Sequence, residues 1–294
     1  MDNHEWLAER FEANRTHLRG VAYRMLGSLS EADDAVQEVW LRLSRSDTSE
    51  VENLKGWLTT VVARICLDML RSRKTRPEEP FDAHMPEAIG SRDDGIDPEH
   101  EALLADSVGL ALLVVLERLA PAERLAFVLH DMFDLPFDEI GPIVGRSPTA
   151  ARQLASRARR RVHGSATVPN ADLASQREVI DAFLTALRGG DFDALVAVLD
   201  PDVVVRADSA AAAPGAPREV RGARNWAKGA IAFSRHARFA RPALVKGAVG
   251  VVMAPHGRLF RALSFTITRG RIVQIDVIAD PERLRQLDLA VLND

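Results

Sequence analysis

The chain has 294 residues, which exceeds the single core of a small domain and suits two or three modules. Apolar residues make up 47% and aromatic residues only 5%, which argues against wholesale disorder and favours helices over an all-β sandwich. With 38 basic and 42 acidic residues, the net charge of −4 gives no sign of a free-standing nucleic-acid binder.

The cysteine content and the N-terminus indicate a soluble cytoplasmic protein that does not contact a membrane. Cys66 is the only cysteine, so no internal disulfide can form, as suits a reducing compartment. No cysteine and histidine cluster has zinc spacing, and we expect neither a metal nor another cofactor. The polar N-terminus lacks the apolar core of a signal peptide, and the apolar run 108–116 is too short to span a bilayer.

Residues 1–76 show helical periodicity. Leu18, Val21, Ala22 and Met25 recur at i, i+3, i+4 and i+7, and the runs 36–43 and 58–69 repeat that spacing. Each set forms one apolar stripe, which predicts a bundle of three or four helices. The following segment, 77–103, is rich in proline, glycine and acidic residues and is predicted to be a linker.

A second helical module is predicted over 104–164 and contains a helix-turn-helix. Gly145 permits a sharp turn, Ser147 suits an N-cap, and Pro148 suits the first position of a helix that runs to about Val162. Its predicted outer face is polar and basic and carries Thr149, Arg152, Gln153, Ser156, Arg157 and Arg160.

This outer face predicts DNA binding. Arg152 and Gln153 are candidate base readers, because arginine can bond guanine twice and glutamine can pair with adenine. Arg157 and Arg160, beside Arg159 and Arg161, are better placed for phosphates. A merely solvated cationic face on an ordinary helical pair is the alternative interpretation.

Residues 172–294 change in character. Helical spacing around 180–187 and a shorter helix at 195–199 precede β-rich runs at 203–206, 248–253, 259–268 and 271–278. We therefore expect two all-α modules followed by an α+β domain.

On these segments, residues 8–163 resemble an extracytoplasmic-function (ECF) sigma factor. The stretch LGSLSEADDAVQEVWLRL (26–43) is similar to the family segment that docks on the clamp helices of RNA polymerase. The resemblance implies that an acidic face meets basic polymerase residues there. Its members are Glu31, Asp33, Asp34 and Glu38.

The stretch GWLTTVVARICLDMLRSRKTR (56–76) resembles the segment that opens and captures the −10 promoter element. The resemblance implies a set of DNA contacts: Asn53, Arg64, Asp68, Arg71, Arg73 and Lys74. Many relatives have asparagine where this chain has Arg64, so base choice there is left open. The helix-turn-helix then corresponds to the −35 reader, and core RNA polymerase and promoter DNA are the implied partners.

The third module resembles the cone-shaped SnoaL-like fold, which a subset of these sigma factors carries. DPDVVVRAD (200–208) and AHMPEAI (83–89) are similar to motifs of that subset, whereas an expected glycine-rich stretch is replaced by 209–213. Candidates for a regulatory pocket or an interdomain contact are Asp202, Arg206, Asp208, Trp226 and His236.

We expect this third domain to regulate rather than catalyse, with a small-molecule ligand or a separate anti-sigma protein as candidate further partners. Two alternatives stay open at this point. One is a helix-turn-helix regulator that is not a sigma factor, and the other is a SnoaL-like isomerase or cyclase with a helical arm.

Overall fold

The structure is a computed structural model that describes residues 3–46, 51, 53–75, 109–164, 170–212, 217–232, 234–255 and 258–292. Among these, the residues up to 75 and residues 116–160 form one compact unit, and residues 109–115 and 161–292 form a second. The predicted linker, its AHMPEAI motif and the side chain of Lys74 lie outside the described residues.

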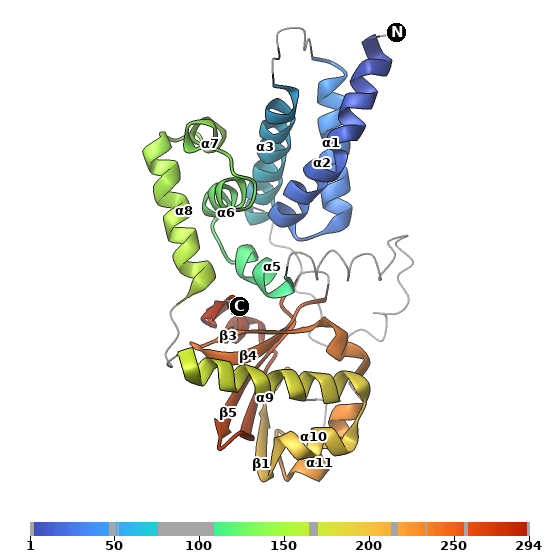
Figure 1. Ribbon diagram of the computed structural model, residues 1–294, viewed down its shortest axis with the longest axis vertical. Coiled ribbons are helices and arrows are strands. Elements are labelled where there is room, and N and C mark those ends of the chain that lie inside the picture. Colours follow the sequence, from blue (N-terminus) through green and yellow to red (C-terminus); the bar gives the residue numbers. More distant parts are fainter. Residues whose placement is uncertain are drawn as a thin grey trace. The chain divides into compact units, whose positions relative to one another are not determined.

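Three helices build the start of the first unit: α1 (Asn3–Leu26), α2 (Leu29–Leu43) and α3 (Leu54–Thr75) (Figure 1). The predicted stripe on α1 is confirmed, because Leu18, Val21 and Met25 are completely buried. Gly27 has a φ of +76°, which ends α1, and Ser28 caps α2 by accepting a hydrogen bond from the Glu31 N–H.

A second set of helices follows: α5 (Leu110–Glu117), α6 (Pro121–Phe127), the π-helical turn η2 (Val128–Met132), α7 (Phe137–Val144) and α8 (Pro148–His163). The predicted helix-turn-helix is α7 and α8. Gly145 adopts φ +70°, and the Ala150 N–H donates to Ser147 Oγ at 3.2 Å, so both predicted turn signals are confirmed. Gly141 is also required, because an added Cβ would lie 2.8 Å from the Arg146 carbonyl oxygen.

The second unit contains one mixed sheet of seven strands in the order β2-β1-β6-β5-β4-β3-β7. The strands are β1 (Leu199–Ala207), β2 (Glu219–Arg221), β3 (Ala240–Val245), β4 (Ala248–Met253), β5 (Arg261–Thr268), β6 (Arg271–Ile278) and β7 (Leu289–Ala290). β1 and β6 pair in parallel and the other pairs are antiparallel. The helices are α9 (Asn170–Gly189), α10 (Phe192–Val198), α11 (Ala223–Ile231), the 3-10 helix η3 (Ser234–Phe239) and α12 (Pro281–Gln286). The predicted α+β class is confirmed.

The core of this domain lies between the sheet and α9, α10 and α11. Phe183 is completely buried there, with its ring stacked on Trp226 at 5.9 Å and edge-on to Phe265 at 5.3 Å. The short helix predicted at 195–199 is α10, but Leu199 already belongs to β1. The elements α11, α12, β2, β3 and β7 were not predicted, because they are short or carry no alternating pattern.

Candidate nucleic-acid and polymerase interface

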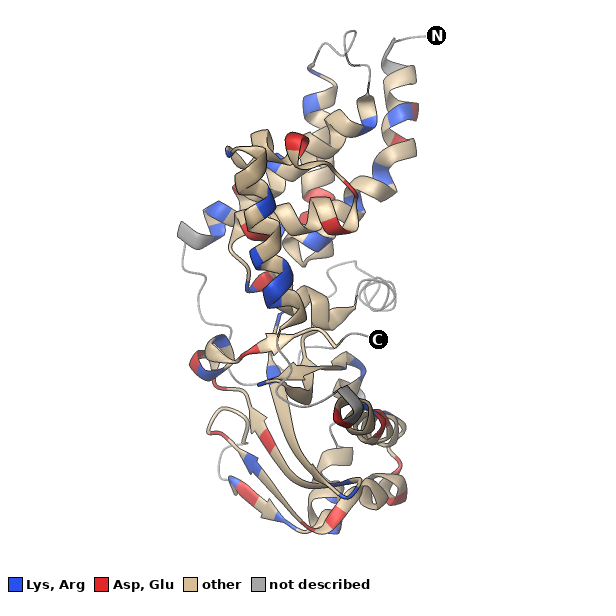
Figure 2. Cartoon of the chain, turned by 60° about the vertical axis from the view of Figure 1, so that its left-hand side comes forward, with Lys and Arg blue, Asp and Glu red and all other residues tan. Residues whose placement is uncertain are grey.

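The predicted reading face of α8 is exposed to solvent. Its exposed side chains are Thr149, Arg152, Gln153, Ser156, Arg157 and Arg160. Ala151, Ala155 and Ala158 are completely buried on the opposite side, so the polar side chains of α8 lie at the surface. Basic residues follow one another along α8 (Figure 2). The arrangement confirms the predicted helix orientation, and the DNA contacts themselves stay predictions.

Two arginines of α8 are held by acidic side chains from earlier helices. Arg157 Nε–H donates to Glu123 Oε1 at 3.0 Å, and Glu123 is only 6% exposed. Arg159 forms an ion pair with Asp131 of η2. Sequence reasoning did not find these acids, because they lie 34 and 28 residues away and no local pattern links them to α8.

Arg152, the first candidate base reader, stands over an aromatic side chain. Its guanidinium carbon lies 5.2 Å from the centre of the Phe137 ring, and that ring stacks on His130 at 3.9 Å. Phe137 is half-buried at the start of α7. The arginine is therefore supported on one side and open on the other.

The predicted −10 surface is formed by α3. Arg64, Asp68 and Arg71 are exposed and follow one face at i, i+4 and i+7, with Arg71 Nη1 3.7 Å from Asp68 Oδ1. Cys66 faces the other way, where burial raises the pKa of its thiol to about 12 and keeps it protonated. Asn53 serves as the N-cap of α3, because its Oδ1 accepts from the Gly56 N–H at 3.0 Å.

Arg73, also predicted to belong to the −10 surface, has partners outside α3. It pairs with Glu31 of α2, and its Nη1 donates to the Leu26 carbonyl oxygen at 3.3 Å. Arg73, which is predicted to contact DNA, is thus paired with Glu31, which is predicted to contact polymerase.

The acidic face of α2 is present, and most of its carboxylates have internal partners. Asp33 pairs with Arg19 at 2.7 Å and Glu38 with Arg42 at 2.8 Å. Asp34 is exposed, and no ion pair of its carboxylate occurs in the described part of the chain. Of the four acids, Asp34 is therefore the most available to a basic partner.

Family models and curated relatives match these same segments. A model of Sigma-70 region 2 matches residues 10–76, and one of Sigma-70 region 4 matches residues 109–162. The probable ECF RNA polymerase sigma factor SigI of Mycobacterium tuberculosis is 36% identical over 290 residues, which is 98% of each chain. The chain belongs to the ECF RNA polymerase sigma factors.

Other similar proteins include a second curated sigma factor and two solved structures. The ECF RNA polymerase sigma factor SigJ of M. tuberculosis is 44% identical over 213 residues, 72% of this chain and 68% of that one. Its crystal structure covers 94% of this chain and 97% of its own, at 37% identity and a TM-score of 0.46. An NTF2-like protein from Burkholderia xenovorans covers 37% of this chain and 85% of its own, at 18% identity and a TM-score of 0.28.

The match to SigI extends through the α+β domain, so the predicted subset with a C-terminal extension is confirmed. The protein is a sigma factor that directs RNA polymerase to promoters, and core RNA polymerase and promoter DNA are its partners. Because the chain belongs to this family, the alternative of a helix-turn-helix regulator that is not a sigma factor is excluded.

In this sigma factor the segments that match regions 2 and 4 contact each other within the first unit. Arg124 of α6 is 2% exposed, and its Nε–H donates to the Arg24 carbonyl oxygen of α1 at 3.1 Å. Burial lowers the pKa of the Arg124 guanidinium to about 10. The ring of Phe133 lies edge-on to His17 and beneath the Arg24 guanidinium, each at 5.2 Å.

The residues predicted to line a regulatory pocket in the C-terminal domain do not share one site, and each contacts different groups. The Asp208 side chain is 5% exposed, and its oxygens accept from the N–H groups of Ala211, Ala279 and Asp280 at 2.9 to 3.1 Å. Trp226 belongs to the domain core through its stacking on Phe183. The geometry therefore assigns structural contacts to both residues.

The other nominated residues lie nearer the surface. Arg206 is exposed on β1 and donates to Glu219 at 3.0 Å, and this bond, with a second from Arg221, lowers the pKa of Glu219. Asp202 is exposed, and His236 is half-buried in η3. Within the described residues, no cluster of histidine, cysteine and carboxylate groups could hold a metal, and no helix is long and apolar enough to cross a membrane.

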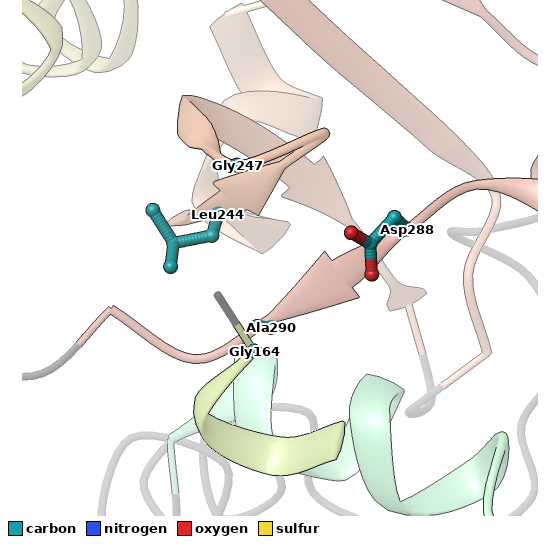
Figure 3. A pocket seen from close by; sticks show the side chains of 5 residues that line it. All are labelled: Gly164, Leu244, Gly247, Asp288 and Ala290. Carbon is teal, nitrogen blue, oxygen red and sulfur yellow. The ribbon is translucent and has the colours of Figure 1, made fainter. Parts of the chain in front are cut away.

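A small hollow in the second unit is lined by Gly164, Leu244, Gly247, Asp288 and Ala290 (Figure 3). Two glycines and an alanine contribute little beyond backbone, and Asp288 is the one charged side chain. None of the residues nominated from the sequence lies in its lining.

Proposed function

We propose that the sigma factor reads the −35 element with the outer face of α8 and the −10 element with the exposed face of α3. The observation that carries this proposal is the separation of faces on α8, where six polar or basic side chains are exposed and the alanines are buried. The turn before it presents the N-terminal half of α8, which is the part that enters the major groove in helix-turn-helix proteins.

Within this face, Arg152 and Gln153 read bases, Thr149 and Ser156 contact base edges or backbone, and Arg157 and Arg160 hold phosphates. Arg157 keeps its ion pair with Glu123 on one side and still has 48% of its side chain exposed. On α3, Arg64, Asp68 and Arg71 read the −10 strand, and Lys74 and Arg73 hold phosphates once Arg73 leaves Glu31. Asn53 acts through the start of α3, which it caps.

The acidic face of α2 docks on polymerase. Glu31, Asp33, Asp34 and Glu38 lie on one helix, and salt bridges to Arg19 and Arg42 hold two of them at the surface. Exposed ion pairs are weak, so a basic partner can displace these arginines at small cost.

The C-terminal domain regulates when the readers engage polymerase, and it is not an enzyme. The candidate acid or base Asp208 already accepts three backbone hydrogen bonds, and the Trp226 ring is packed in the core. Asp208 is then not available for proton transfer to a ligand, and the Trp226 ring is not available to line a ligand pocket. A small molecule or an anti-sigma protein that acts on this domain would act through its surface.

The test is run-off transcription with core polymerase from templates that carry each single base change in the −35 element. We expect Arg152→Ala to lose preference at one position, at a cost in discrimination of about 1–3 kcal/mol. Arg218→Ala removes the same charge from an exposed site in the C-terminal domain and should leave every preference unchanged. A uniform loss on all templates would instead make Arg152 a phosphate contact.

A further inference from the structure

Two side chains, Phe137 and His130, form a column beneath the exposed candidate base reader Arg152. The Arg152 guanidinium lies over Phe137, and Phe137 lies over His130 with the two rings inclined by 33°. His130 is fixed in turn, because its Nδ1 is 2.9 Å from the Leu135 carbonyl oxygen. The column therefore connects the backbone before α7 to the tip of a reading residue on α8.

The local backbone explains how these side chains meet. His130 lies in the π-helical turn η2, in which each hydrogen-bonded loop contains one residue more than in an α-helix. Asp134 then adopts φ +55°, and the Leu135 N–H returns to the Leu129 carbonyl oxygen at 2.9 Å. This reversal places Phe137 at the first position of α7, directly against His130.

Phe137 is not needed to hold α7 in the core. Ile140, Ile143 and Val144 of the same helix are 0 to 6% exposed and make its apolar contact. Phe137 is half-buried at the edge, and its ring centre lies 3.9 Å from that of His130 and 5.2 Å from the guanidinium carbon of Arg152.

A ring in this position changes how an arginine can bind. A free arginine side chain has many rotamers, and fixing it on a base carries an entropic cost. A bidentate contact with guanine also requires the guanidinium plane to align with the base edge. A ring face that already restricts this plane lowers the cost of the aligned geometry.

We propose that Phe137, supported by His130, is a positioning residue that orients Arg152 and thereby determines how strictly one −35 base pair is read. The inference rests on the proposed function, in which Arg152 contacts a base. Phe137 itself touches no base in this mechanism and acts through Arg152.

The test uses the full chain with core polymerase and the same set of single-change −35 templates. The variants are Phe137→Leu, which removes the ring, Phe137→Tyr, which keeps it, Arg152→Ala, and the Phe137→Leu/Arg152→Ala double variant. Phe137→Leu should reduce discrimination at the Arg152 position by roughly two- to five-fold, the worth of an exposed cation–π contact. Phe137→Tyr should retain it, and the double variant should equal Arg152→Ala alone.

Each contrary result has a distinct meaning. If Arg152→Ala loses discrimination and Phe137→Leu keeps it, positioning by Phe137 is overturned and base reading by Arg152 stands. If Phe137→Leu weakens all templates equally, the ring has only a structural role and the inference is again overturned. If Arg152→Ala changes no preference, the proposed base contact fails and the inference fails with it.

Thermal unfolding of each variant shows whether the module still folds. Should Phe137→Leu unfold, His130→Ala removes the supporting ring from a half-buried site and is judged by the same position-specific readout. A loss confined to the Arg152 position supports the inference, and unchanged discrimination in His130→Ala overturns it.

Discussion

Asp208 closes the sequence motif DPDVVVRAD and has a structural task in this domain. Its carboxylate joins the turn after β1 to the start of α12, because it accepts from Ala211 on one side and from Ala279 and Asp280 on the other. Arg283 adds a contact at 3.4 Å. A carboxylate with this many donors satisfies backbone groups from segments about 70 residues apart, and this need explains an acid at the position.

Changing Asp208 to Asn should destabilise the C-terminal domain. The amide group replaces one acceptor by a donor, so at least one backbone N–H loses its partner, at a cost of about 1–3 kcal/mol. The measurement is hydrogen exchange, with faster exchange expected at the amides of Ala279 and Asp280 or at Ala211. Asp202→Asn on the exposed part of β1 is the control, and equal effects of the two substitutions would contradict the structural role.

At the scale of helices, the contact between the two reading modules conflicts with simultaneous reading of both promoter elements. The −35 and −10 elements lie about 25 base pairs apart, which is about 85 Å at 3.4 Å per base pair. In this conformation α7 packs on α3, and α8 begins at Pro148, four residues after α7 ends at Val144. Since α3 with 22 residues is itself only about 33 Å long, the proposed reading of the −10 element by α3 and of the −35 element by α8 requires this contact to open.

Phe133→Ala should favour the open state, because its ring contacts both His17 and Arg24 of α1. We expect a larger radius of gyration in solution scattering and more promoter-dependent transcript at limiting sigma factor. Trp6→Ala removes an exposed ring from the N-terminal part of α1 and serves as the control. If Phe133→Ala leaves both the radius and the transcript unchanged, this contact does not hold the modules together.

For the whole molecule, the net charge of −4 is compatible with DNA binding. Part of the acidic charge lies in ion pairs with arginines of the helical modules. Glu31 pairs with Arg73, Glu123 pairs with Arg157, and Asp131 pairs with Arg159. Binding that is independent of sequence grows with the number of phosphates neutralised, so these pairs limit it.

Deleting residues 172–294 should change the amount of transcript without changing the preferred promoter sequence. All the described residues nominated for DNA contact belong to the first unit, which extends to residue 160, and the deleted residues belong to the second. The same template set, transcribed by full-length and truncated chains, measures both quantities. Circular dichroism controls for folding of the truncated chain, and a changed −35 or −10 preference would contradict a purely regulatory role.

Sequence alone determined the features that depend on neighbours within a few residues. The turn at Gly145, the cap at Ser147 and the inward alanines of α8 follow from backbone conformation and helical spacing, and the structure confirms them. The order of the two sigma segments was equally readable, because each is a continuous stretch. The α+β class of the last domain followed from the change from helical to alternating spacing.

Only the tertiary structure decided which groups meet across long separations. It paired Arg73 with Glu31 and Arg157 with Glu123, surrounded Asp208 with backbone donors, and placed Phe137 beneath Arg152. These contacts depend on how helices and strands pack. The sequence around a charged or aromatic residue does not show which distant residue that side chain will contact. Local patterns therefore predicted the reading helix, whereas packing decided how its arginines are held.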